Sequence, residues 1–163
     1  MRIIGIDPGY AIVGFGVIEY NKARFSVVEY GAVTTPADMN FNQRLCEIYS
    51  DLCYIFDKYK PDFLSIERLY FTSNQKTAIA VAQARGVTLL AAKQRGIEIF
   101  EYTPLQVKQS VTGYGKAVKK QVQEMTKRIL DLDEIPKPDD TADALAMAIC
   151  HAHSYNSRLC GLN

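Results

Sequence analysis

The sequence lacks several features that would place the protein in other classes. Among its 163 residues no apolar run approaches the roughly 18–20 residues of a membrane span, and no signal peptide precedes the first apolar segment. The four cysteines form no CxxC pair, and with two histidines they form no metal-like grouping. Cys46 and Cys53, seven residues apart, are expected to be reduced core thiols of one helix. These absences favour a cytoplasmic protein with a single hydrophobic core.

The chain also has little net charge, +1 at pH 7, but its charges are unevenly distributed. Residues 1–67 carry 6 basic and 9 acidic side chains, and residues 121–163 carry 4 basic and 7 acidic ones. Residues 68–120 carry 9 basic and 2 acidic side chains, a net charge of +7. Such a middle segment is typical of a surface for a polyanion such as nucleic acid, although solvated helix faces produce the same pattern.

The spacing of apolar residues predicts an α/β domain in which helices cover a mixed sheet. Three strands, at 2–7, 13–20 and 25–33, are joined by connections too short for a crossover, which predicts an antiparallel meander. Two more strands, at 62–67 and 97–102, alternate with helices expected at about 40–59, 75–94, 104–111, 117–132 and 141–153. Gly86 near the middle of a helix costs about 1 kcal/mol relative to alanine, so we expect close approach by another helix, within the fold or across a dimer.

Four carboxylates stand at a strand end or a helix start beside an apolar run. Asp7 follows IIGI, Glu67 follows FLSI, and Asp140 and Asp143 lie three residues apart on one helical face. Each has a structural explanation by itself: a turn former before Pro-Gly, a solvated loop residue, or a helix cap, a role that Asp139 fits as well. Brought together, the four repel one another unless a divalent cation such as Mg²⁺ or Mn²⁺ balances them. Two such ions would suit phosphodiester hydrolysis.

Motifs along nearly the whole chain carry a family resemblance: GIDPG, SIE, QARGV, FEYTPLQVKQSVTGYGKAVKKQV and DTADALAMAICHAH, in this order. In them the sequence resembles the RuvC-type Holliday-junction resolvases, the crossover junction endodeoxyribonucleases. The resemblance implies a ribonuclease H-like fold with a mixed five-stranded sheet flanked by helices. We expect one nuclease domain at 1–155 and a short C-terminal tail at 156–163. The implied function is the resolution of four-way DNA junctions by paired symmetric nicks during homologous recombination and DNA repair.

The same resemblance implies a set of site residues. The family's acidic tetrad falls on Asp7, Glu67, Asp140 and Asp143, as catalytic residues and as ligands of Mg²⁺, with Mn²⁺ as a substitute and two ions per site. Asp140 is preferred to Asp139 because the family pattern, acidic-x-Ala-Asp-Ala-Leu, is matched by DTADAL. Within the family this position can also be His.

Basic and aromatic residues extend the resemblance to DNA binding. Lys108 and Lys119 match lysines that contact DNA near the cut, and Tyr70, with Phe71 beside it, matches an aromatic that stacks at the opened junction. Arg85 is expected either at a subunit interface or on the DNA backbone. The predicted DNA-binding residues are Lys108, Lys119, Tyr70, Phe71, Arg68 and Arg85. The implied partners are four-way junction DNA, a second copy of the chain and a branch-migration helicase complex.

Three other functions account for parts of the sequence. A ribonuclease H-like nuclease of the kind thought to process ribosomal RNA precursors also begins with a GIDxG-like strand, but QARGV and QVKQ argue against it. An actin-like ATPase fragment shares a DPG-like turn, but 163 residues are too few for the two domains that enclose a nucleotide. A junction-binding module without activity would lack a carboxylate, and all four are present.

Overall fold

A five-stranded mixed sheet forms the centre of the protein. The computed structural model describes residues 1–69 and 75–159, apart from the side chains of 75–76 and 156–159. The sheet has the order β3-β2-β1-β4-β5, with β1, β2 and β3 antiparallel and β4 and β5 parallel to β1. This arrangement confirms the predicted α/β fold and its opening meander. The strands are β1 (Arg2–Asp7), β2 (Ile12–Asn21), β3 (Arg24–Thr34), β4 (Phe63–Glu67) and β5 (Glu98–Tyr102).

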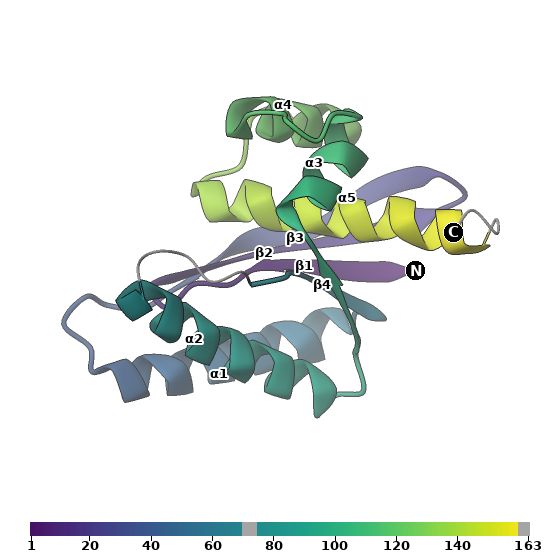
Figure 1. Cartoon of the computed structure of the whole chain (residues 1–163). Coiled ribbons are helices and arrows are strands. Elements are labelled where there is room, and N and C mark those ends of the chain that lie inside the picture. Colours follow the sequence, from purple (N-terminus) through teal and green to yellow (C-terminus); the bar gives the residue numbers. More distant parts are fainter. Residues whose placement is uncertain (70–74, 160–163) are drawn as a thin grey trace.

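Helices cover both faces of this sheet (Figure 1). On one face lie α1 (Phe41–Tyr59) and α2 (Gln75–Lys93), while α5 (Asp139–Leu159) crosses the other face. The shorter α3 (Pro104–Thr112) and α4 (Lys119–Ile129) pack against α5. Because successive strand side chains point to opposite faces, Ile3 joins the apolar cluster under α5, whereas Ile4 and Ile6 join the cluster under α1 and α2. The first strand is therefore buried on both sides.

Local capping explains where two of the helices begin and end. Asn40 caps α1 by accepting a hydrogen bond from the Asn42 N–H, and Lys60 ends that helix with a left-handed backbone. Thr103 and Gln106 form a capping box at the start of α3, with Pro104 as its first residue and Gly113 (φ 75°) after its end. These signals are local in the sequence, and both helices lie within a residue of their predicted positions.

The last two helices differ more from prediction. α4 is shorter than the expected 117–132, because Val118 still has an extended backbone (φ −78°, ψ 158°) and the helix ends at Ile129. α5 is longer than the expected 141–153: it begins at Asp139 and continues to Leu159. Tyr155, beyond the predicted end, packs its ring against Phe63 of β4 and against His151, so a tertiary contact accompanies the helix past the aliphatic stripe that the sequence shows. No helix in the described ranges is long and apolar enough to cross a membrane.

Glycines in the sheet allow α5 to lie directly on the strands. A Cβ at Gly5 of β1 would overlap the carbonyl oxygen of Ala144, and one at Gly14 of β2 would overlap the carbonyl oxygen of Asp140. The Ser65 hydroxyl of β4 also donates a buried hydrogen bond of 2.7 Å to the Met147 carbonyl. Together these contacts fix the start of α5 against the ends of β1 and β2.

Two expectations about single residues need correction. Nothing among the described residues lies within 4 Å of a Cβ built at Gly86, so no other helix of this fold approaches it, and only the alternative of a dimer contact remains. Cys46 is exposed rather than in the core, because the apolar stripe of α1 runs through Ile48 and Leu52 on another face; Cys53 is buried, and both thiols are free.

Candidate active site

Two predicted site residues end neighbouring parallel strands. Asp7 is the last residue of β1 and Glu67 the last of β4, and these strands pair with Ile6 opposite Ile66. Their carboxyl ends therefore meet at one edge of the sheet, where open α/β sheets usually carry their sites. The prediction that the two strands are neighbours is confirmed.

The helix α5 brings the second pair to the same edge. Asp7 lies opposite Gly14 in the β1–β2 register, and Gly14 is where the backbone of Asp140 approaches the sheet. Asp140 and Asp143 occupy the first turns of α5, whose N-terminus favours negative charge. The closeness of Asp140 to Asp7 therefore depends on the absence of a side chain on β2.

A cavity of about 220 Å³ opens between these elements. Three carboxylates, Asp7, Glu67 and Asp143, line it together with the ammonium-bearing Lys108 of α3 and Lys119 of α4. Asp140 is not part of this lining. The rest of the wall is apolar and consists of Pro104, Val107, Val122, Ala146 and Met147. The cavity therefore presents acidic and basic groups side by side, with apolar side chains forming the rest of its wall.

The carboxylates raise one another's pKa. Burial is the main reason that the pKa of Asp7 rises to about 7, and the negative charges of Asp143, Asp140 and Glu67 add to the rise, while Lys119 opposes it. The pKa of Glu67 is raised by burial and by Asp143, with Lys108 acting in the opposite direction. Burial likewise raises the pKa of Asp143, although its hydrogen bond to Lys119 lowers it. Four acidic groups thus share one electrostatic environment.

Lysines partly balance this cluster. The Lys119 ammonium lies 2.8 Å from Asp143 Oδ2 and 3.6 Å from Asp139 Oδ2. Asp139 in turn accepts a hydrogen bond of 2.9 Å from Lys137 Nζ, which together with the positive charge holds its pKa below the usual value. Asp139 is therefore paired with Lys137 and with the cavity lysine Lys119, and its charge raises the pKa of Asp143, whereas the charge of Asp140 acts on both Asp7 and Asp143. Because two lysines neutralise Asp139 and its charge is not among those that act on Asp7, Asp140 fits the acidic site better than Asp139.

The donor set fits a hard divalent cation in chemistry, since every acidic group offers carboxylate oxygen. As they stand, however, no three His, Cys, Asp or Glu side chains in residues 1–69 and 75–159 are grouped closely enough to hold a metal ion. The carboxylates can still shift one another's pKa at these separations, because Coulomb interactions extend beyond the distances at which side chains bind one ion. Lys119 supplies a positive charge beside Asp143 that an ion would replace.

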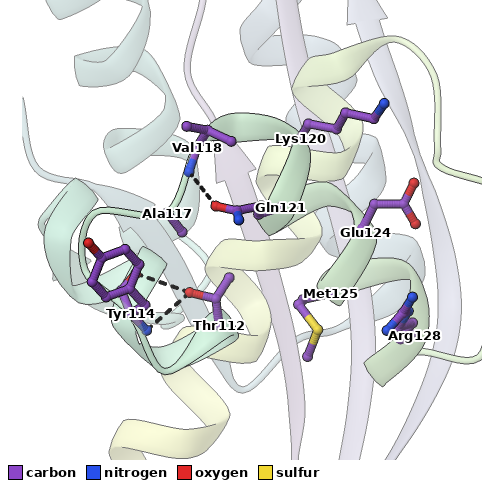
Figure 2. A pocket seen from close by; sticks show the side chains of 9 residues that line it. All are labelled: Thr112, Tyr114, Ala117, Val118, Lys120, Gln121, Glu124, Met125 and Arg128. Carbon is purple, nitrogen blue, oxygen red and sulfur yellow. Dashed lines mark hydrogen bonds between the residues drawn. The ribbon is translucent and has the colours of Figure 1, made fainter.

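The remaining predicted DNA-binding residues differ in their surroundings. The Arg68 side chain is 56% exposed and lies 3.6 Å from Glu101, whereas that of Arg85 is 13% exposed and is bonded within the fold. Tyr70 and Phe71 lie outside the described residues. A larger hollow of about 480 Å³ lies over the α3–α4 turn, and Glu124 is the one carboxylate in its lining (Figure 2). It shares no lining residue with the acidic cavity.

Glu101 was not predicted as a site residue from the sequence. In the structure it accepts a hydrogen bond from Arg85 and lies near Arg68. It stands near the end of β5, so the pattern that singled out Asp7 and Glu67 applies to it as well. Nothing in the local sequence, however, distinguishes a carboxylate that faces arginines from one that faces other carboxylates.

A mixed sheet with carboxylates at the ends of β1 and β4 and at the start of α5 defines a nuclease of the ribonuclease H-like class. A family model described as crossover junction endodeoxyribonuclease RuvC matches residues 3–151. The chain belongs to the RuvC family of crossover junction endodeoxyribonucleases, which are metal-dependent enzymes.

Individual relatives agree with this assignment. The RuvC proteins of Ruminiclostridium cellulolyticum and Fusobacterium nucleatum are 58% and 56% identical, over 95% and 98% of this chain and 93% and 84% of theirs. T. thermophilus RuvC, solved in complex with a Holliday junction substrate, has a TM-score of 0.91 and is 31% identical, covering 99% of this chain and 97% of that one. The yeast mitochondrial Holliday junction resolvase shares the fold at 12% identity, with a TM-score of 0.68 over 98% of this chain and 82% of that one.

Proposed function

We propose that this chain resolves four-way DNA junctions by cutting two strands of like polarity at symmetric positions, in homologous recombination and DNA repair. The observation that carries the proposal is the cavity in which Asp7, Glu67 and Asp143 meet Lys108 and Lys119. In a chain of this family, that combination suits a scissile phosphate. The junction in the complex of the T. thermophilus relative supports the choice of substrate.

The proposed metal is Mg²⁺, with Mn²⁺ as a substitute, and two ions per site. Asp7, Glu67, Asp140 and Asp143 would hold them, and Asp7 and Asp143 are the ligands that we favour as central to the site. The ions would supply an activated water and charge stabilisation at the leaving oxygen. Burial with mutual repulsion, which raises the pKa of Asp7, supports this role because a cation is the group that relieves both effects.

The lysines and the arginine beside the cavity would bind DNA. Lys108 and Lys119 line the cavity and would neutralise the phosphate on which charge develops, and Lys119 would exchange its ion pair with Asp143 for that phosphate. Arg68, more than half exposed, is proposed to contact the backbone farther along. Tyr70 and Phe71 are proposed as the aromatic pair that stacks on unpaired bases. The nuclease domain is proposed to comprise 1–155, with 156–163 as a tail.

Two symmetric nicks require two sites, and we propose that a homodimer supplies them. The outward face of α2 supports this, because Ile79 and Leu90 are 62% and 53% exposed and Gly86 between them has open space above it. A second α2 would cover this face and explain the glycine. The branch-migration helicase complex is a further proposed partner. Because the curated relatives are bacterial and bacterial DNA lies in the cytoplasm, the cytoplasm is the proposed compartment.

A cleavage assay tests the proposed function. The protein is incubated with a mobile four-way junction, a linear duplex or a structured RNA, each with Mg²⁺ or with EDTA. We expect paired nicks confined to the junction, absent in EDTA, and reduced on the order of 10²–10³-fold in Asp7→Asn, as when one electrostatic stabiliser of a transition state is removed. Junction affinity of this variant should remain, since phosphate contacts supply it.

Asp51→Asn is the matched control, because it makes the same change at an exposed position of α1. It should cleave like the original chain. Junction binding without nicks in both Mg²⁺ and Mn²⁺ would contradict the proposed activity.

A further inference from the structure

Arg85 lies in the middle of α2 and points into the protein toward the ends of two strands. Its Nε donates a hydrogen bond of 3.2 Å to the backbone carbonyl of Glu67, the last residue of β4. Its Nη2 donates to the carboxylate of Glu101 on β5. One side chain therefore ties α2 to both strands at the edge of the sheet that carries the acidic site.

Further hydrogen bonds and an ion pair join β4, β5 and Arg68 at this edge of the sheet. Glu67 lies opposite Tyr102 in the β4–β5 register, and the N–H of Arg68 donates a 2.8 Å hydrogen bond to the Tyr102 carbonyl. Arg68 also places its Nε 3.6 Å from Glu101. The chain leaves β4 at this point, so Arg85 holds the last residue before the loop.

The shape of the guanidinium matters for this contact. Its planar group directs two donors at two acceptors on different strands, whereas the ammonium of a lysine is a single point and cannot reproduce both directions. With 13% exposure and bonds to Glu67 and Glu101, Arg85 also has little surface for a DNA backbone, unlike Arg68 at 56%. These observations disfavour the predicted DNA contact.

We propose that Arg85 is a positioning residue for Glu67: it fixes the backbone of Glu67 so that this carboxylate faces the acidic cavity. The inference rests on the proposed function, in which Glu67 is a metal ligand. Arg85 stands beside Gly86 on the helix whose outer face is the proposed subunit contact.

The test compares Arg85→Lys with Arg95→Lys. Arg95 is a suitable control because it follows the same helix and makes a two-pronged bond to Asp57 of α1, at 2.7 and 2.9 Å, away from the site. Both variants keep the net charge. Three quantities are measured: Mn²⁺ affinity of the DNA-free protein by electron paramagnetic resonance, junction affinity in EDTA, and single-turnover cleavage at saturating junction.

Arg85→Lys should weaken Mn²⁺ binding and slow cleavage by about 10–100-fold, the usual effect of losing a group that orients a ligand. Junction affinity should change less than about twofold, and added Mn²⁺ should restore part of the cleavage. Arg95→Lys should match the original chain in all three. Glu101→Gln provides a second variant, with an effect in the same direction that does not add to that of Arg85→Lys.

Two results would overturn the assignment. One is Mn²⁺ affinity in Arg85→Lys equal to that of the Arg95→Lys control. The other is a loss of junction affinity as large as the loss of cleavage, which would make Arg85 a DNA contact. If the original chain binds Mn²⁺ but cuts no junction, the proposed function fails, whereas the role of Arg85 is still decided by the metal titration.

Discussion

At the scale of single residues, Asp7 is the most informative position. Its carboxylate ends a strand that is buried on both faces, and burial with three like charges raises its pKa to about 7. In the unfolded chain the pKa of this carboxyl returns to its ordinary value, 3.8. The folded state therefore binds the proton more tightly, and the cost of ionising Asp7 is absent near pH 4, grows as pH rises and is complete above pH 7.

This linkage predicts that Asp7→Asn stabilises the metal-free protein at pH 8. A shift from 3.8 to about 7 corresponds to a penalty of at most about 4 kcal/mol, so we expect a melting temperature several degrees higher than that of the original chain in EDTA. The difference should shrink toward pH 4, where Asp7 is protonated. Thermal unfolding from pH 4 to 8 measures it, and equal melting temperatures throughout would contradict the electrostatic origin.

The effect of Mg²⁺ on the melting temperature gives a second prediction for the same pair of proteins. It should raise the melting temperature of the original chain at pH 8 more than that of Asp7→Asn, since a ligand that binds the folded state stabilises it according to its affinity. Equal stabilisation of the two proteins would indicate that the ion binds elsewhere.

At the scale of elements, the close packing of α5 on β1 and β2 brings Asp140 and Asp143 to the acidic site, so the site depends on this contact. Gly14→Ala would force Asp140 away from β2, so we expect a loss of about 1–3 kcal/mol in the free energy of unfolding, with a marked loss of cleavage. Urea unfolding and the junction assay measure the two effects. Wild-type cleavage in this variant would mean that the approach of α5 is not required.

Gly86→Ala makes the same chemical change where the fold leaves open space. Because alanine is favoured over glycine inside a helix, this variant should unfold with a free energy up to about 1 kcal/mol higher, when association is prevented. The opposite signs of the two substitutions would separate close packing from helix propensity. Destabilisation by Gly86→Ala under these conditions would contradict the open space above this residue.

At the scale of the whole molecule, the proposed homodimer predicts that association depends on the exposed face of α2 around Ile79 and Leu90. Ile79→Glu and Leu90→Glu should each weaken the dimer at least about tenfold, because an interface there would bury an unpaired charge. Leu105→Glu, on an equally exposed leucine of α3, should leave the dimer intact. Sedimentation velocity over a concentration series measures the dissociation constant, and unchanged association in both α2 variants would place the contact elsewhere.

Local signals in the sequence were enough to predict the order of the elements and most of their bounds, and they singled out carboxylates at strand ends as candidates. Strand alternation, the capping box at Thr103 and the glycine after α3 involve residues a few positions apart. The strand-end positions of Asp7 and Glu67 follow from the same local patterns, and short connections imposed the meander. Because neighbouring strands were expected to bring their ends together, the acidic cluster followed from the order of elements.

The sequence by itself determined the class of fold and the order of elements, because turn chemistry and apolar periodicity act over short distances; its motifs supplied the acidic residues as candidates. Only the tertiary structure decided which charges meet. Arg85 faces Glu67 and Glu101, Lys119 pairs with Asp143, and Gly86 lies open to solvent. Each outcome depends on how a helix is rotated and seated on the sheet, which is set by packing between segments far apart in the chain rather than by any local pattern.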